Sequence, residues 1–386
     1  YANFGAGDPD GENNFTDSEG RGGFRFEPPS GFLSVCTANL KDADYASIGP
    51  TSLAGPPDQH FDTLLWTGDA ISPRHIGGLN FQPDLVWMMS RTSSSTHNTI
   101  FDTLRGPNLR LMSNLTSAED TQPMCHSFDL DGFTIGDDRN NNSENFVAWC
   151  WKAGNGTVEN SDGTIASTVS VNQNAGFSIA SWEGTGAVGT IGHGLSKAPE
   201  FIIVKNREVA TNWPTWLPFA QTTNRGLYIN TTGAEDDGVV YFFGDESNTT
   251  LPTSSVISLG SNATANQSGK GMIVYCWHSV EGFSKFGSYK GNDNADGPFV
   301  YLGFKPAMVI IKNTGSGHIW SIFDNKRDPH NPIDGYLRAE DTAAESTGTT
   351  QLDFVSNGFK LRYTGSHVNG SPDTNVYMAW AEMPFK

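Results

Sequence analysis

The sequence predicts an all-β protein made of three tandem antiparallel β-sandwich domains of about 100 residues each. A strand motif, in which a proline precedes an apolar run and a polar pair, occurs around Pro83, Pro199 and Pro306, at a spacing of roughly 110 residues. Hydrophobicity alternates with period two, and no amphipathic helix longer than about two turns can be drawn. The 43 glycines among 386 residues are typical of a fold with many turns.

Further landmarks recur in the same order after each of these strands. An Ala-Glu-Asp triplet follows at 118–120, 234–236 and 339–341, and an aromatic strand closes each repeat at 146–151, 272–277 and 377–382. Gly-Phe-Ser opens the second and third repeats, and a diverged Phe-Asp-Thr opens the first. Because all landmarks keep one order, we expect copies of one module placed end to end, each closing its own interior.

Domain boundaries follow from these landmarks. Residues 1–58 match no repeat and are predicted to form an N-terminal extension; residues 59–154, 176–280 and 281–386 form the three repeats, with a linker or connecting strand at 155–175. The near absence of a linker before the third repeat predicts a fixed relation between the last two units. The chain starts with a tyrosine and shows no signal peptide, so we expect a processed form or a fragment.

Charge and cysteine usage restrict the possible partners. The formal net charge of −18 argues against nucleic acid and anionic membranes, since both are bound by basic surfaces, and no apolar run is long enough to span a bilayer. Cys150 and Cys276 occupy the same place in two repeats, with Ala381 assigned to that place in the third. They are therefore interpreted as small core residues facing away from their aromatic neighbours, and Cys36 and Cys125 have no evident partner.

Several segments resemble a known group of proteins. The run 163–170 that leads into Gly-Phe-Ser at 176–178, the segment 192–195 and the segment 281–289 resemble the repeated β-domains of tail-fibre and other virion-appendage proteins of marine bacteriophages. The segment 26–32 resembles the end of a lectin-like SPRY module. The resemblance implies a virion component that is usually distal, often trimeric and in contact with the host surface. It supplies no catalytic motif that could be placed on this chain.

Signatures of enzymatic sites are missing from the sequence. Nucleophile-elbow, zinc-protease and phosphate-loop motifs do not occur, and the nine histidines lack metal-ligand spacing. His193, between two glycines, is interpreted as a turn residue. The Ala-Glu-Asp triplets could supply paired carboxylates for acid/base chemistry or calcium, but each belongs to its own domain, so a role in accepting backbone amides is favoured. We expect no enzymatic activity.

Two candidate binding sites remain. Asp8, Asp10, Glu12 and Glu19 fall at positions 1, 3, 5 and 12 of an EF-type calcium loop, although position 6 is an asparagine instead of glycine. A solvated acidic loop is the alternative. Trp213 and Trp216 could form an exposed platform on which a sugar ring stacks, the alternative being buried strand-end aromatics.

The functional expectation is a structural virion protein of a bacteriophage, a tail fibre or appendage on the particle surface that adheres to the host. Its expected partners are further copies of the chain, with a trimer favoured, other virion proteins and a host-surface glycan; calcium is the one cofactor considered. A secreted glycan-binding or glycan-degrading β-protein is one alternative. A pure spacer or capsid-decoration protein is another, because spacers and adhesins both need only stable domains in series.

Overall fold

The computed structural model describes residues 15–18, 20, 24, 26–30, 53, 55–219, 226–236, 242–244, 249–315 and 317–382. Strands dominate this part of the chain, and the fold is all-β with several antiparallel sheets. Its helices are single turns: η2 (Pro57–Gln59), η3 (Asp137–Arg139), α2 (Ala263–Asn266) and α3 (Ser366–Asn369). None of the described helices has the length and apolarity needed to cross a membrane.

The first repeat contributes a six-stranded sheet and a three-stranded sheet. Its strands are β1 (Phe61–Thr67), β2 (Arg74–Gly77), β3 (Leu85–Ser90), β4 (Thr99–Asp102), β5 (Gly106–Met112), β6 (Asp120–Thr121), β7 (Cys125–Asp129), β8 (Gly132–Ile135) and β9 (Asn145–Trp151). The larger sheet has the order β1-β9-β3-β4-β5-β6, and the smaller has the order β2-β8-β7.

The second repeat contributes a seven-stranded sheet, β10-β11-β12-β18-β14-β15-β16, and the pair β13-β17. These strands are β10 (Val158–Asn160), β11 (Ser167–Asn172), β12 (Phe177–Glu183), β13 (Gly189–Gly192), β14 (Phe201–Asn206), β15 (Pro214–Trp216), β16 (Leu227–Tyr228), β17 (Val256–Leu259) and β18 (Gly271–Trp277). The segment 155–175, expected to be a linker or a connecting strand, contains β10 and β11, which extend the sheet of the second repeat as its outer strands.

The third repeat contributes a five-stranded sheet, β19-β26-β21-β22-β23, and a three-stranded sheet, β20-β25-β24. These strands are β19 (Ser284–Lys290), β20 (Phe299–Tyr301), β21 (Pro306–Asn313), β22 (Trp320–Asp324), β23 (Leu337–Arg338), β24 (Leu352–Val355), β25 (Gly358–Leu361) and β26 (Thr374–Ala381). No named sheet mixes strands from different repeats among the described residues. All three repeats place the closing aromatic strand between the opening strand and the proline-led strand.

A buried asparagine closes each sandwich in the same way. Its amide donates to the carbonyl of a loop after the opening strand: Asn140 to Ile71 at 2.7 Å, Asn266 to Ala187 at 2.7 Å and Asn369 to Asn294 at 2.8 Å. The loop begins with a glycine in every repeat, because a Cβ there would lie 1.8–2.2 Å from a backbone carbonyl oxygen, as at Gly68, Gly184 and Gly291. These contacts are too close for any side chain.

The large sheets are buried on both faces. In the first two repeats, one face packs inside the sandwich, where Cys150 and Cys276 lie, and the opposite face carries Trp151 and Trp277. This arrangement confirms that the cysteines face away from their aromatic neighbours and act as small core residues. Cys125, Cys150 and Cys276 are free and buried, whereas Cys36 lies outside the described residues.

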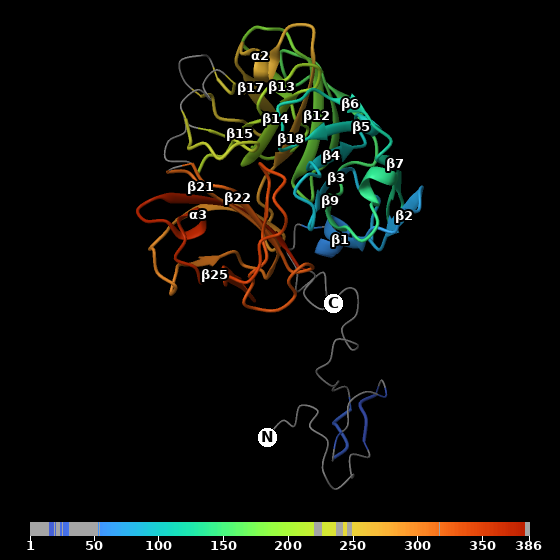
Figure 1. Cartoon of the computed structure of the whole chain (residues 1–386), viewed down its shortest axis with the longest axis vertical. Helices are drawn as coiled ribbons and strands as arrows, with labels where there is room; N and C mark the ends of the chain where they lie inside the picture. The colour runs from blue at the N-terminus through green and yellow to red at the C-terminus, as the bar shows by residue number, and fades with distance from the viewer. Residues whose placement is uncertain are drawn as a thin grey trace.

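The aromatic faces of the three large sheets meet in one common core. The rings of Trp151, Trp277 and Trp380 contact one another edge to face, with centroids 6.0, 5.3 and 6.2 Å apart. Buried residues from all three repeats belong to this core. The repeats thus surround a shared centre (Figure 1). The expectation of modules in a row, each closing only its own interior, is wrong in this respect.

Strand pairing also corrects one sequence alignment. Leu85, Phe201 and Met308, each two residues after the proline of its repeat, pair with Trp151, Trp277 and Trp380. Counting back from these tryptophans, the equivalent of Cys150 and Cys276 is Ala379, and the expected Ala381 is wrong. Because side chains alternate with period two, a shift by two residues preserves the pattern and escapes detection from sequence.

Candidate functional site

The two binding sites predicted from sequence have different outcomes. Asp8, Asp10, Glu12 and Glu19, the predicted calcium ligands, lie outside the described residues. Trp213 and Trp216 are 0% and 2% exposed, so the expected sugar-stacking platform is wrong. Trp213 packs in the common core and Trp216 inside the second sandwich, because β15 is an interior strand of its sheet.

His193 has the structural role that its sequence context indicates. Its Nδ1 accepts the backbone N–H of Leu195 at 3.1 Å, its Nε2 lies 3.1 Å from the Thr253 carbonyl, and burial lowers the pKa of the imidazole to about 4. Within the described residues, no group of three or more His, Cys, Asp or Glu side chains could hold a metal ion.

The glutamates of the Ala-Glu-Asp triplets lie at contacts between repeats. The backbone N–H of Glu119 donates to Arg207 of the second repeat at 2.6 Å, and that of Glu235 donates to Thr314 of the third at 3.2 Å. The bond that completes this series comes from Glu345, which donates to Arg91 of the first repeat at 2.8 Å. The three repeats therefore form a closed ring of contacts, from first to second, second to third and third to first.

Glu345 thus replaces Glu340 as the third member of this series, which corrects the triplet assigned from sequence. Glu340 occupies the position of two asparagines instead. Its side chain accepts the N–H of Trp320 at 3.0 Å, as the side chains of Asn114 and Asn230 accept the N–H of Asn98 and Trp213. The interpretation of these acidic residues as acceptors of backbone amides holds for Glu340.

A second series of hydrogen bonds follows the same ring. The indole N–H of Trp213 donates to the Leu115 carbonyl of the first repeat at 2.9 Å, and that of Trp320 donates to the Tyr228 carbonyl of the second at 3.1 Å. In the first repeat, Asn98 takes this position, and its amide donates to three carbonyls of the third repeat, at 2.9–3.1 Å. These residues lie at the start of the strand that pairs with the proline-led strand: Asn98 and Trp213 directly precede β4 and β15, and Trp320 is the first residue of β22.

Two of the three junctions contain a buried ionic cluster. At the first, the Arg105 guanidinium lies 2.5 Å from Asp102 and 3.0 Å from Glu119, while the Tyr275 hydroxyl of the second repeat donates to Asp102 at 2.7 Å. Arg207 adds a second bond to Glu119 at 2.7 Å. Burial by itself would lower the pKa of Arg105, but the neighbouring Asp102, Tyr275 and Glu119 raise it overall, so the guanidinium stays charged.

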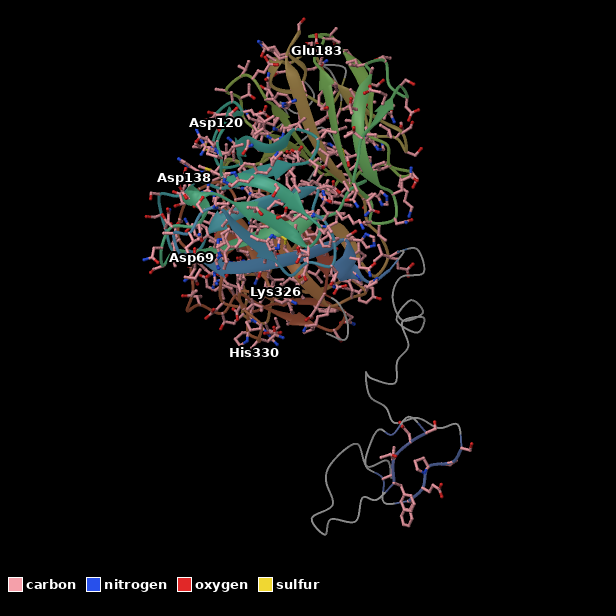
Figure 2. The ribbon with its side chains drawn as sticks, turned by 90° about the vertical axis from the view of Figure 1, so that its right-hand side faces the viewer. Asp69, Asp120, Asp138, Glu183, Lys326 and His330 are labelled. Atoms are coloured by element: carbon pink, nitrogen blue, oxygen red, sulfur yellow. The ribbon has the colours of Figure 1, made fainter. Side chains whose placement is uncertain are left out.

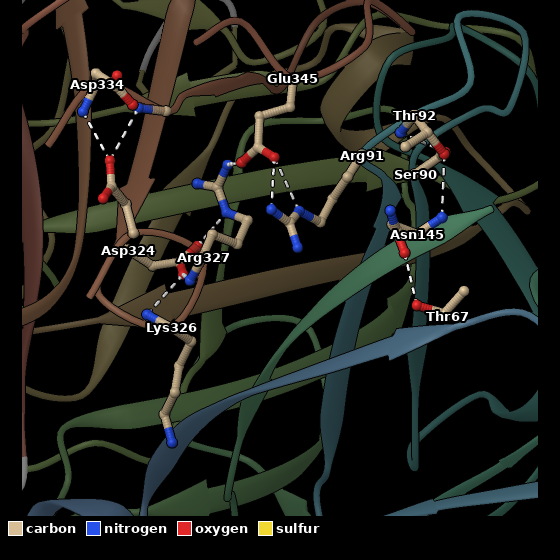
Figure 3. A network of polar contacts seen from close by, with 12 residues as sticks. Thr67, Ser90, Arg91, Thr92, Asn145, Asp324, Lys326, Arg327, Asp334 and Glu345 are labelled. Carbon is tan, nitrogen blue, oxygen red and sulfur yellow. Dashed lines mark hydrogen bonds and ion pairs between the residues drawn. The ribbon is translucent and has the colours of Figure 1, made fainter. Parts of the chain in front are cut away.

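A similar buried ionic cluster lies at the junction between the third and first repeats (Figure 3). The Arg327 guanidinium lies 2.5 Å from Asp324 and 2.6 Å from Glu345, and Arg91 of the first repeat binds the same glutamate at 2.8 Å. The indole of Trp149, equivalent to Tyr275, donates to Asp324 at 3.0 Å. The sequence signal that could have identified both clusters is Phe-Asp-x-x-Arg, at 101–105 and 323–327.

The remaining junction, between the second and third repeats, is apolar at the equivalent positions. Continuing the register of β15 by one residue places Leu217 where the other repeats have Asp102 and Asp324. Strand pairing places Met378 where they have Tyr275 and Trp149. Both are buried in the common core. At this junction both the carboxylate and the hydrogen-bond donor that would face it are replaced by apolar side chains. Keeping only one of the two would leave a buried polar group without a partner, which costs free energy.

Buried lysines complete two junctions. The ammonium groups of Lys205 and Lys312 occupy equivalent positions and donate to carbonyls of the preceding repeat, at Thr116 (2.9 Å) and Thr232 (3.2 Å). Burial lowers the pKa of each to about 8. Burial also raises the pKa of nearby Glu340 to about 7.

These polar groups hold the repeats together. The buried guanidinium groups are matched by carboxylates, and the buried ammonium groups are bound by carbonyl oxygens from the next repeat. Such pairing fixes the relative orientation of the repeats. Acidic side chains such as Asp69, Asp138 and Glu183 project from the outside of the body (Figure 2).

A family model matches most of the chain. The family described as a domain of unknown function, DUF7483, matches residues 56–384. No curated protein matches the chain. One family model thus spans all three repeats of the ring, and the chain belongs to the DUF7483 family.

Proposed function

We propose that this protein is a structural component of a bacteriophage particle, a tail fibre or appendage that contributes to adhesion at the host surface, without enzymatic activity. The observation that carries the proposal is the closed ring of repeats. The charged and hydrogen-bonding groups at its junctions bind one another and so hold the repeats together. The resemblance of segments 163–170, 192–195 and 281–289 to phage appendage domains supports the same function. A virion surface exposed to shear and proteases favours such a tightly joined body.

Aromatic packing joins the two ends of the ring. The rings of Phe61, in the first strand, and Trp380, in the last, stack with centroids 5.7 Å apart. The first and last strands of the ring therefore meet in the common core. We extend the proposal to the partners: other virion proteins, a host-surface glycan and further copies of the chain, with a trimer favoured.

The experiment is to purify the phage particles whose genome encodes this chain and to locate it. Mass spectrometry of the particles, followed by immunogold electron microscopy with antibodies against residues 56–382, should place it on a fibre or appendage. Absence of the chain from purified particles would contradict the proposal. A uniform location on the capsid shell would favour the decoration-protein alternative, and mass photometry of the isolated chain tests the trimer.

A further inference from the structure

One exposed aromatic pair sets the third repeat apart from the other two. Phe299 and Tyr301 lie on β20, the edge strand of the small sheet, and are 48% and 59% exposed. They alternate with buried Val300, so both rings project from the outer face of the sheet. Because the two rings lie on one face of one strand, they form a contiguous apolar patch, and such patches with a polar rim mark interaction sites.

The other repeats serve as internal controls for this position. Strand pairing aligns Tyr301 with Gly77, since these residues face Gly358 and Gly132 on the neighbouring strand of the small sheet. The second repeat has Gly192 after the equivalent buried isoleucine. A Cβ at Gly77 would meet His75 and Asp131 within 2.8 Å, and one at Gly192 would meet the Asn160 side chain at 1.6 Å. Polar side chains thus cover this place in two repeats, and aromatic rings stand open in the third.

Polar groups surround the aromatic pair on the same face. The Lys285 ammonium lies 5.1 Å from the Tyr301 ring centre and donates to the Tyr301 carbonyl at 2.8 Å. Lys360 pairs across the strands with Phe299 and binds the 84% exposed Asp296 at 2.6 Å. Gly358 has no side chain and so leaves a shallow depression beside Tyr301. Glycine is required there, because a Cβ would collide with the Val300 carbonyl oxygen.

From this arrangement we infer that the outer face of β20 is a carbohydrate-binding site that takes a pyranose ring of a host-surface saccharide. The ring stacks its apolar C–H face on Tyr301 and Phe299, while its hydroxyls bind the ammonium of Lys285 and the carboxylate of Asp296. This inference rests on the proposed adhesive function and names its ligand. The candidate residues for sugar stacking are therefore the exposed Phe299 and Tyr301 instead of the buried Trp213 and Trp216.

A protein partner fits this surface less well. Two side chains fall far short of the roughly 800 Å² per partner that a stable protein interface buries. Addition of a foreign strand to β20 is opposed by Pro298, which has no N–H to donate, and by Lys285, which occupies the Tyr301 carbonyl. The charged residues around the pair are also unusual for the centre of a protein interface, where they are depleted.

The test is binding of the whole chain to an array of pyranose oligosaccharides that includes cellohexaose and chitohexaose, followed by saturation-transfer NMR on positive probes. The variant Phe299→Thr/Tyr301→Gly, which installs the residues of the second repeat, should lower affinity at least tenfold. Lys285→Ala should lower it several-fold. Leu130→Ser is the matched control, because Leu130 is 84% exposed on a hairpin of the first repeat, and it should bind as the unaltered chain does.

Thermal unfolding of each variant shows whether its fold is retained, and Phe299→Thr alone provides a milder change. The inference is wrong if no saccharide binds at millimolar concentration, if the double variant binds normally, or if Leu130→Ser loses as much affinity. Saccharide binding by a chain that is absent from virions would contradict only the proposed function. A virion location without saccharide binding would contradict only this inference.

Discussion

The junction between the first and second repeats and the junction between the second and third share one backbone frame but differ in side-chain chemistry. Both contain the glutamate N–H bond to the next repeat and the tryptophan indole bond to the previous one. Yet Asp102 and Tyr275 form a charged, hydrogen-bonded contact at the first, whereas Leu217 and Met378 occupy the same positions at the second. The frame therefore sets the geometry, and either a satisfied ionic cluster or an apolar pair can fill it.

The largest effect is expected from breaking the ionic junction. Arg105→Ala leaves Asp102 in a fully buried site without its cation, so the free energy of unfolding should fall by about 3–5 kcal/mol. Urea denaturation measures this change. Lys270→Ala, which removes an exposed ion pair with Glu208, is the control and should cost no more than about 1 kcal/mol. Equal losses would mean that the buried cluster stabilises the protein no more than an exposed ion pair does.

The stability that the junction of the second and third repeats contributes should depend on pH. Glu340 has a pKa of about 7 in the folded protein, well above the value of the unfolded chain, so its contribution to stability is present in full at low pH and is lost as pH rises through 7. Between pH 4.5 and 8, unaltered protein should lose up to about 3 kcal/mol more than Glu340→Gln.

Denaturation midpoints of both proteins across this pH range test the prediction. The difference between them isolates Glu340 from other groups, including neighbouring Lys312, whose lowered pKa of about 8 matters above this window. Parallel pH profiles would contradict the assignment. Asn114→Gln, at the equivalent and uncharged position of the first repeat, is the control and should leave the slope unchanged.

A smaller and equal effect is expected from the bonds that both junctions share. Trp213→Phe and Trp320→Phe keep an aromatic ring but remove the indole N–H, which leaves the Leu115 and Tyr228 carbonyls without this donor. Each variant should lose about 1–3 kcal/mol in the free energy of unfolding. Chemical denaturation of the two variants side by side measures this loss. Clearly unequal losses would show that the frame is not equivalent at the two junctions.

The smallest effect is expected when the ionic junction is converted to the apolar type. Asp102→Leu, Arg105→Met and Tyr275→Met together remove both buried charges and the hydroxyl donor, while Glu119 keeps its ion pair with Arg207. The combined variant should unfold within about 1 kcal/mol of the unaltered protein by denaturant titration. A loss as large as that of Arg105→Ala alone would show that the two chemistries are not interchangeable.

Local features of the chain were predictable from sequence. The proline-led strands, the closing aromatic strands and the inward-facing Cys150 and Cys276 all follow from alternation, because one strand displays its two faces at successive residues. Two assignments failed, Ala381 for Ala379 and Glu340 for Glu345. Both lie in the third repeat, where a shift along the chain leaves the local pattern acceptable.

The sequence by itself determined that the chain is all-β, that it carries one repeated strand plan, and that turns and glycines separate the strands, since these properties depend on neighbours in the chain. Only the tertiary structure decided that Trp151, Trp277 and Trp380 meet, that Trp213 and Trp216 are buried, and that Phe299 and Tyr301 are open. Burial of a second sheet face depends on residues more than 100 positions away. No local pattern records such a partner.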